Sequence, residues 1–138
     1  MTSLVFDHVG LSVADLDAQR RFYSEALGLD ELEEEFAMPE AGIRTAILRG
    51  PSGLKIELIE RGGSSAQEFD DPFDGASVQG YFHWALYVGD VAEAFAQALA
   101  AGAREVSAPA PAVRAGAWFA YVKDPEGNLL ELIQPAVA

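Results

Sequence analysis

The sequence contains no cysteine and few basic residues. Without cysteine, the 138-residue chain has no disulfide, thiolate ligand or cysteine nucleophile, so nitrogen and oxygen atoms must hold any bound metal. Nine Lys and Arg residues stand against 22 Asp and Glu residues, which gives a formal net charge of −13. Such a charge repels the phosphate backbone of nucleic acid. We therefore expect no nucleic-acid partner.

Long apolar segments are also absent. No apolar run reaches the roughly 20 residues that a membrane-spanning helix needs, and the N-terminal "MTSLVFDHVG" lacks the basic and apolar regions of a secretion signal. These features predict a soluble, cytoplasmic protein without a membrane partner. Hydrophobic residues make up 50% of the chain, which is enough for a core. The acidic run "DELEEEF" predicts a solvated strand or turn, where charge discourages edge pairing.

The chain repeats itself. "FDHVGLSVADLDAQRRFYSEALGL" from Phe6 matches "YFHWALYVGDVAEAFAQALAAGA" from Tyr81, and "GPSGLKIELIER" matches "DPEGNLLELIQP" near the C-terminus. An internal repeat determines architecture, because each copy forms the same structural unit. The repeat predicts one module at residues 5–60 and a second at 81–135, joined at 61–80 by a Gly-, Ser- and Asp-rich linker or lid.

Each module is predicted to begin with a histidine-bearing strand that leads directly into a helix. Asp15 and Asp90 are suitable N-caps for the two helices, and Gly28 and Gly102 are suitable for a left-handed exit. Three strands follow each helix, separated by glycine and proline clusters, at about 32–37, 43–49, 54–60, 104–108, 116–122 and 129–134. The fold class is therefore α+β, with two tandem βαβββ modules.

Four ionisable side chains alternate against the aliphatic faces of their strands: His8, Glu57, His83 and Glu131. Taken singly, each is more typical of a structural residue. The two histidines are, however, the only ones in the chain, and they occupy equivalent positions of the repeat. If the modules pair about a pseudo-twofold axis or swap between two chains, all four side chains meet. Two buried carboxylates would repel each other unless a divalent cation lay between them. Two nitrogen and two oxygen ligands suit Ni, Co, Zn, Fe or Mn and leave coordination positions open.

The paired modules resemble the vicinal oxygen chelate superfamily, which includes glyoxalase I, methylmalonyl-CoA epimerase, extradiol ring-cleaving dioxygenases, and fosfomycin and bleomycin resistance proteins. The resemblance rests on "DHVGLSV", "RRFYSEALGL" and "DPEGNLLELIQP" and covers about residues 5 to 135. It implies that the two modules form a half-open mixed β-sheet barrel. It also implies a homodimer, and one divalent metal per site, bound by His8, Glu57, His83 and Glu131 within one chain or across two.

The order His, Glu, His, Glu resembles glyoxalase I most closely. The resemblance then implies a lyase or isomerase that transfers a proton next to a carbonyl, through an enediolate, on a small 2-oxo compound or its thiol adduct. Glu131 would be the catalytic base, and Glu57 the opposite carboxylate that returns the proton. A non-haem iron ring-cleaving dioxygenase and a non-catalytic drug-binding resistance protein are the alternatives. The acidic charge favours the latter where the drug is cationic.

The small-molecule substrate is expected to contact further residues around the site. Ser12 occupies a position where bacterial glyoxalases commonly carry an arginine for the glutathione carboxylate, so a thiol cosubstrate stays one alternative among others. Arginines are candidates because their charge could hold an anionic substrate. Aromatic residues are candidates because strand alternation could place them in the cavity. The full set of expected substrate contacts is Ser12, Arg61, Tyr87, Arg114, Phe119 and Tyr121.

Overall fold

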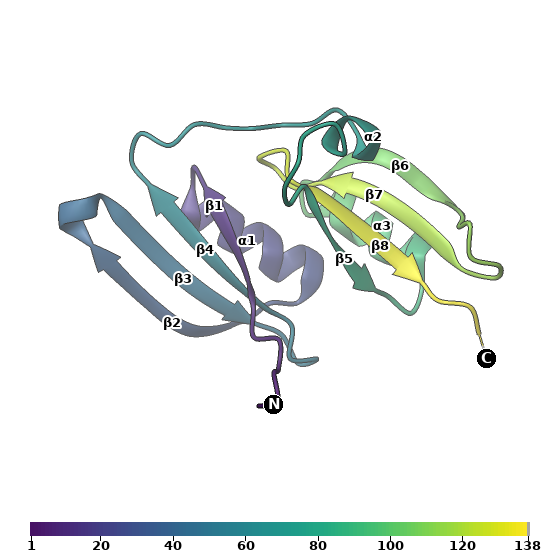
Figure 1. Ribbon diagram of the computed structural model, residues 1–138, viewed down its shortest axis with the longest axis horizontal. Coiled ribbons are helices and arrows are strands. Elements are labelled where there is room, and N and C mark those ends of the chain that lie inside the picture. The colour runs from purple at the N-terminus through teal and green to yellow at the C-terminus, as the bar shows by residue number, and fades with distance from the viewer. Residues whose placement is uncertain (138) are drawn as a thin grey trace. The chain divides into compact units, whose positions relative to one another are not determined.

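The computed structural model describes residues 1–137 and divides into two compact units, Met1–Ser65 and the chain from Ala66 onward (Figure 1). Each unit contains one four-stranded sheet. The division places most of the stretch expected to be a linker in the second unit. None of the helices described within residues 1–137 is long and apolar enough to cross a membrane.

The first unit has a mixed sheet in the order β1-β4-β3-β2. Strands β1 and β4 are parallel, and the other neighbours are antiparallel. The elements in chain order are β1 (Val9–Val13), α1 (Leu16–Leu27), β2 (Glu31–Met38), the 3-10 turn η1 (Pro39–Ala41), β3 (Ile43–Arg49) and β4 (Lys55–Arg61).

The second unit repeats this topology, with the order β5-β8-β7-β6 and a parallel pair β5 and β8. Its elements are α2 (Pro72–Gly75), β5 (His83–Tyr87), α3 (Val91–Ala100), β6 (Arg104–Pro111), β7 (Trp118–Lys123) and β8 (Leu129–Gln134). The predicted α+β fold with a βαβββ pattern in each half is confirmed. Both sheets have two free edges, so neither sheet closes on itself into a barrel.

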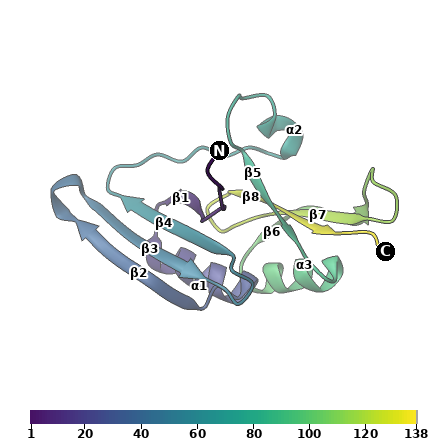
Figure 2. The ribbon, with the colours of Figure 1, turned by 60° about the horizontal axis from the view of Figure 1, so that its bottom comes forward.

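One face of each sheet is covered by the helix of the same unit, as Figure 2 shows. Beneath α1, Ile56 and Leu58 of β4 are fully buried, and beneath α3 so is Leu130 of β8. Apolar side chains alternate with polar ones along these strands, so burying one set turns the other set to the opposite face. We call this opposite side the open face; Glu57 lies on it in the first unit and Glu131 in the second.

The two helices begin in the same way. Asp15 accepts a hydrogen bond from the amide of Ala18 at 2.9 Å, and Asp90 accepts one from Glu93 at 3.0 Å, so both predicted N-caps are confirmed. Gly28 ends α1 in the left-handed conformation, with φ of 70°.

A second hydrogen bond at each helix start comes from the last strand of the unit. Glu60 Oε2 accepts from the amide of Leu16 at 2.8 Å, and Gln134 Oε1 accepts from the amide of Val91 at 2.9 Å. These amides open the first turn of a helix and have no partner within it. The end of the last strand therefore fixes the start of the helix in both units.

Replacing Gln134 by alanine removes this hydrogen bond and leaves the amide of Val91 without it. We expect Gln134→Ala to lower the free energy of unfolding by about 1 kcal/mol, similar to the loss of the N-cap in Asp90→Ala. Urea denaturation followed by circular dichroism measures both. The control is Gln79→Ala, which changes an exposed side chain outside the helices and strands. A Gln134→Ala variant as stable as this control would contradict the prediction.

Candidate functional site

The first histidine lies beside a glutamate of its own unit. His8 directly precedes β1, one residue before the strand that was predicted to contain it, and Glu57 lies in the middle of β4. His8 Nε2 is 2.9 Å from Glu57 Oε2, and the two side chains are 32% and 21% exposed. On its other side, His8 Nδ1 is 2.6 Å from Asp7 Oδ2. The imidazole is thus held between two carboxylates.

The second unit repeats the pair. His83 is the first residue of β5 and Glu131 is the third of β8. Their Nε2 and Oε2 atoms are 3.1 Å apart. Besides Glu131, this histidine has two aromatic rings as neighbours, since the Phe82 ring centroid lies 4.6 Å away and that of Tyr121 lies 5.6 Å away. The Nδ1 atom of His83 is buried without a hydrogen-bond partner.

The structure brings together two of the four predicted ligands within each unit. The residues it describes contain no group of three or more His, Asp or Glu side chains that could hold a metal ion. Each unit thus contributes half of the predicted ligand set. That the two pairs meet at one ion stays a prediction.

Each pair has a geometry that fits a metal ion. Bonds from such an ion to histidine nitrogen and carboxylate oxygen are about 2.0 to 2.2 Å long, so two ligands lie about 3.0 Å apart at the right angle of a six-coordinate ion and about 3.4 Å apart at the tetrahedral angle that four-coordinate zinc prefers. The observed separations are 2.9 and 3.1 Å. The same separations form a hydrogen bond when the imidazole nitrogen carries a proton. The pairs can therefore exchange a shared proton for a cation with little side-chain movement.

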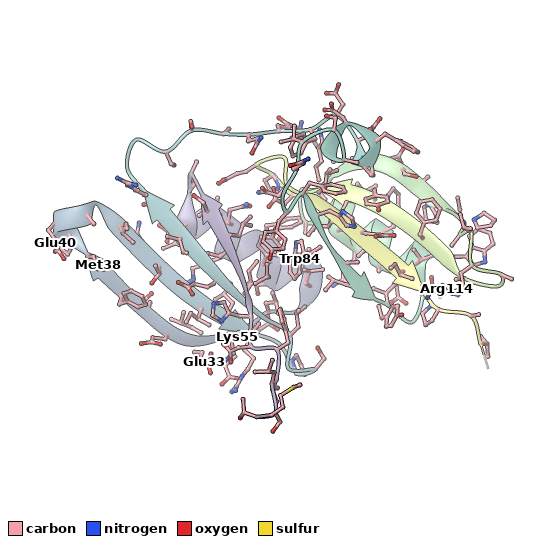
Figure 3. The ribbon with its side chains drawn as sticks, viewed as in Figure 1. Glu33, Met38, Glu40, Lys55, Trp84 and Arg114 are labelled. Atoms are coloured by element: carbon pink, nitrogen blue, oxygen red, sulfur yellow. The ribbon has the colours of Figure 1, made fainter. Side chains whose placement is uncertain are left out.

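Charged neighbours surround His8. The hydrogen bond with Asp7 raises the pKa of His8, burial opposes this effect, and the negative charge of Glu57 raises the pKa further. Asp7 and Glu33 both contact the ammonium group of Lys55, at 3.3 and 3.0 Å. Figure 3 labels Lys55 and Glu33, which lie side by side in the first unit. This cluster was not predicted from the sequence, because Asp7 and Lys55 are 48 residues apart and neither charge recurs in the second copy of the repeat, where Phe82 and Leu129 stand.

Tyr121 contacts the second pair directly. It is the cross-strand neighbour of Glu131 and forms a side-chain hydrogen bond with it. Burial raises the pKa of Tyr121 well above its usual value, and the negative charge of Glu131 and this hydrogen bond raise it further. The phenol therefore stays protonated at neutral pH and donates to the Glu131 carboxylate. From the sequence, Tyr121 was predicted only as a substrate contact.

The other expected substrate contacts lie in three places. Ser12 of β1 and Arg61 at the end of β4 are exposed on the open face of the first unit. Tyr87 and Phe119 lie on the open face of the second, where the Phe119 and Tyr121 ring centroids are 6.0 Å apart. Arg114 lies in the loop between β6 and β7, outside the sheet (Figure 3).

This arrangement matches a known family. Residues 5–132 fit the model of the Glyoxalase/Bleomycin resistance protein/Dioxygenase superfamily. The chain belongs to this superfamily. It is 31% identical to the lactoylglutathione lyase of Haemophilus influenzae over 131 residues, which cover 92% of this chain and 90% of that protein.

Two longer plant proteins are also similar. A lactoylglutathione lyase of Arabidopsis thaliana is 33% identical over 132 residues, which cover 94% of this superfamily member but only 44% of the plant protein. The chain thus spans less than half the length of that relative. The crystal structure of glyoxalase I from Zea mays superposes with a TM-score of 0.75 at 24% identity, covering 96% of this chain and 45% of the maize chain. At this identity the likeness shows the fold alone.

Asp7 can be tested as the cause of the raised His8 pKa. In the metal-free protein we expect Asp7→Asn to lower the His8 pKa toward about 6.5, the ordinary value of histidine, because the strongest hydrogen-bond acceptor is lost. Titration of the imidazole protons by NMR measures this value. The raised pKa of His8 also sets how the stability of the protein depends on pH. A raised folded pKa stabilises the protein below the unfolded pKa, and this contribution is lost as the pH rises through the folded value.

The matched control is Asp17→Asn, which removes a carboxylate of the first unit that pairs with Arg44 instead. An Asp7→Asn variant whose His8 titrates as in the parent protein would show that Asp7 is not the main cause.

Proposed function

We propose that this protein is a metal-dependent lyase of the glyoxalase I type, which moves a proton next to the carbonyl of a small 2-oxo compound or its thiol adduct. The observation that carries the proposal is the repeated pair: one imidazole and one carboxylate per unit, 2.9 and 3.1 Å apart, at equivalent positions of the repeat. The relatives named lactoylglutathione lyase support a thioester product.

His8, Glu57, His83 and Glu131 would hold one divalent ion of Ni, Co, Zn, Fe or Mn, either within a chain or across a homodimer. Nitrogen and oxygen donors suit such an ion, and the separations within each pair support this assignment. When bound, the ion supplies Lewis-acid stabilisation of the negative charge that develops on the substrate oxygens.

Proton transfer is assigned to the two carboxylates. Glu131 takes the proton from the carbon that bears the sulfur, and Glu57 returns one to the former carbonyl carbon. The substrate is isomerised, so no external oxidant or reductant is needed. The hydroxyl of Tyr121 orients Glu131 through their hydrogen bond. Leu130 and Leu132, both buried, flank Glu131 along the strand and fix its direction.

A ring-cleaving dioxygenase is the second candidate. It is favoured by the ring contacts among His83, Phe119 and Tyr121, which give the second pair a partly aromatic surface suited to a flat substrate. Iron would be the metal in that case, because the ring is opened with dioxygen. The drug-binding alternative has no such observation in its favour beyond the acidic charge of the chain.

Metal content tests the site itself. We expect the purified protein to bind about one Ni, Co, Zn, Fe or Mn ion per site by elemental analysis, and Glu57→Gln and Glu131→Gln each to weaken binding by at least about tenfold, the smallest loss typical of altering a metal's immediate surroundings. Glu34→Gln, which removes the same charge from an exposed position on β2, is the control. If the protein takes up none of these ions, the proposed metal site is wrong.

Activity separates the two candidates. With the hemithioacetals that 2-oxoaldehydes form with glutathione or another thiol, Glu131→Gln should lower kcat by about 100-fold or more, the usual contribution of a general base. The appearance of the thioester measures this rate. Catechols with iron and dioxygen form the second substrate series. Turnover of catechols without turnover of any thiol adduct would replace the lyase by the dioxygenase.

A further inference from the structure

Two cations face each other at the His83 end of the second sheet. His83, Leu129, Lys123 and Arg104 form one cross-strand row on the open face. Arg104 and Lys123 are direct neighbours in this row, and like charges directly opposite each other destabilise a sheet. Lys123 is only 8% exposed, so water cannot fully compensate its charge. The row therefore needs an anion.

Glu68 supplies that anion. Its Oε1 atom accepts hydrogen bonds from Arg104 Nη2 at 2.8 Å and from Lys123 Nζ at 3.1 Å. The hydrogen bonds from Lys123 and Arg104 hold the pKa of Glu68 below its usual value. Glu68 belongs to the segment that precedes β5, and its partners lie 36 and 55 residues further along the chain. The pairing therefore fixes this segment to the sheet.

Two glycines leave room for this segment because they have no side chain. A Cβ atom on Gly127, in the turn between β7 and β8, would lie 2.7 Å from the Glu68 carboxyl carbon. A Cβ on Gly75 of α2 would lie 2.5 Å from the ring of Phe82. The Phe82 ring in turn contacts that of His83. The segment thus touches the sheet at β6 and β7 through Glu68, and returns to it at β5 beside His83.

In the first unit, the cation that corresponds to Lys123 is paired within the sheet. There Arg49 ends β3 as Lys123 ends β7, but its cross-strand neighbour is Glu31, with a side-chain contact of 2.7 Å. The edge strand itself provides the anion. Residues 1–7 are exposed, with Leu4 at 87% and Phe6 at 78%. In the second unit Arg104 occupies the place of Glu31, so the cation that ends β7 is paired by Glu68 from outside the sheet.

We propose that residues 66–82 form a strap, latched by Glu68, that closes the His83 end of the open face and directs a bound substrate toward Tyr87 and Phe119. The open face is accessible at that other end, where Tyr87 is 71% exposed. The direction given to the substrate rests on the proposed function, which takes His83 and Glu131 as the reacting end. The latch itself requires no catalysis.

The accessibility of His83 tests the strap in the metal-free protein. Diethyl pyrocarbonate modifies accessible neutral imidazoles, and mass spectrometry gives the rate for each histidine separately. Because opening the latch raises the population of locally open states, we expect Glu68→Gln to speed modification of His83 about fivefold or more. His8 serves as the internal reference and should keep its rate. Amide hydrogen exchange across 66–82 should accelerate about tenfold.

Two further variants complete the test. Glu105→Gln removes the same charge from the neighbouring residue on β6, whose side chain points to the opposite face from Arg104, and should change neither measurement. Arg104→Gln removes one partner of Glu68 and leaves Lys123 paired, so it should give a smaller acceleration in a protein that folds. If Glu68→Gln does not fold, Arg104→Gln alone tests the proposal by the same two measurements.

The outcomes are distinct. Faster exchange of the strap with unchanged His83 modification would show that the strap does not cover His83, and unchanged exchange would show that Glu68 is not a latch. Either result overturns the proposal. A parent protein that binds no metal and turns over no substrate would remove the proposed function, while His83 would still respond to Glu68→Gln. Failure of one proposal is thus distinguishable from failure of the other.

Discussion

The parallel pairing between the first and last strand of each unit is the constraint on which the site depends. Parallel neighbours require a long connection, and here that connection contains the helix and the two other strands of the unit. The register places Glu57 opposite Gly10 and Glu131 opposite Ala85, in each case two residues after the histidine. Side chains two residues apart along a strand share a face, so this register puts the histidine and the glutamate on the same face, where their side chains are in contact.

The same strand also fixes the helix. Three residues after each site glutamate, Glu60 and Gln134 point to the other face and hold the first amides of α1 and α3. An odd spacing along a strand sends two side chains to opposite faces. One strand therefore supplies a ligand candidate on its open face and a helix cap on its covered face. A shift of its register by one residue would destroy both together.

Much of this architecture could be predicted because its signals are local or repeated. Asp15 and Asp90 were identifiable as caps from their place before an apolar periodic segment, and the alternation around Glu57 and Glu131 gave their face. The Glu68 latch could not be found in this way. Glu68 lies in a segment without periodicity, and its partners are distant in sequence. Nothing in the pattern distinguishes Arg104 from an ordinary exposed arginine until it is placed beside Lys123.

The two histidine–glutamate pairs could be predicted from the sequence, but the residues that lie beside them could not. Which groups lie next to a histidine depends on strand register and on rotamers, and neither is determined by the spacing of the repeat. Asp7 was adjacent in sequence to His8, yet a neighbouring residue on a strand normally points to the other face. It reaches the imidazole because regular β1 begins only at Val9. The hydrogen bond of Tyr121 with Glu131 likewise required the pairing of β7 with β8.

These surroundings make two pairs of similar geometry chemically different. Asp7 binds His8 in the first unit and also contacts Lys55, so charged groups extend from that pair across the sheet. The second pair is bordered by the rings of Phe82 and Tyr121. A carboxylate that must take a proton from carbon works best where few charges and little water compete for it. The aromatic border of Glu131 provides such a place, and Tyr121 supplies a fixed neutral donor in place of water. The repeat thus supplies equivalent ligand candidates, and the divergence of the two copies around them favours Glu131 over Glu57 as the proposed base.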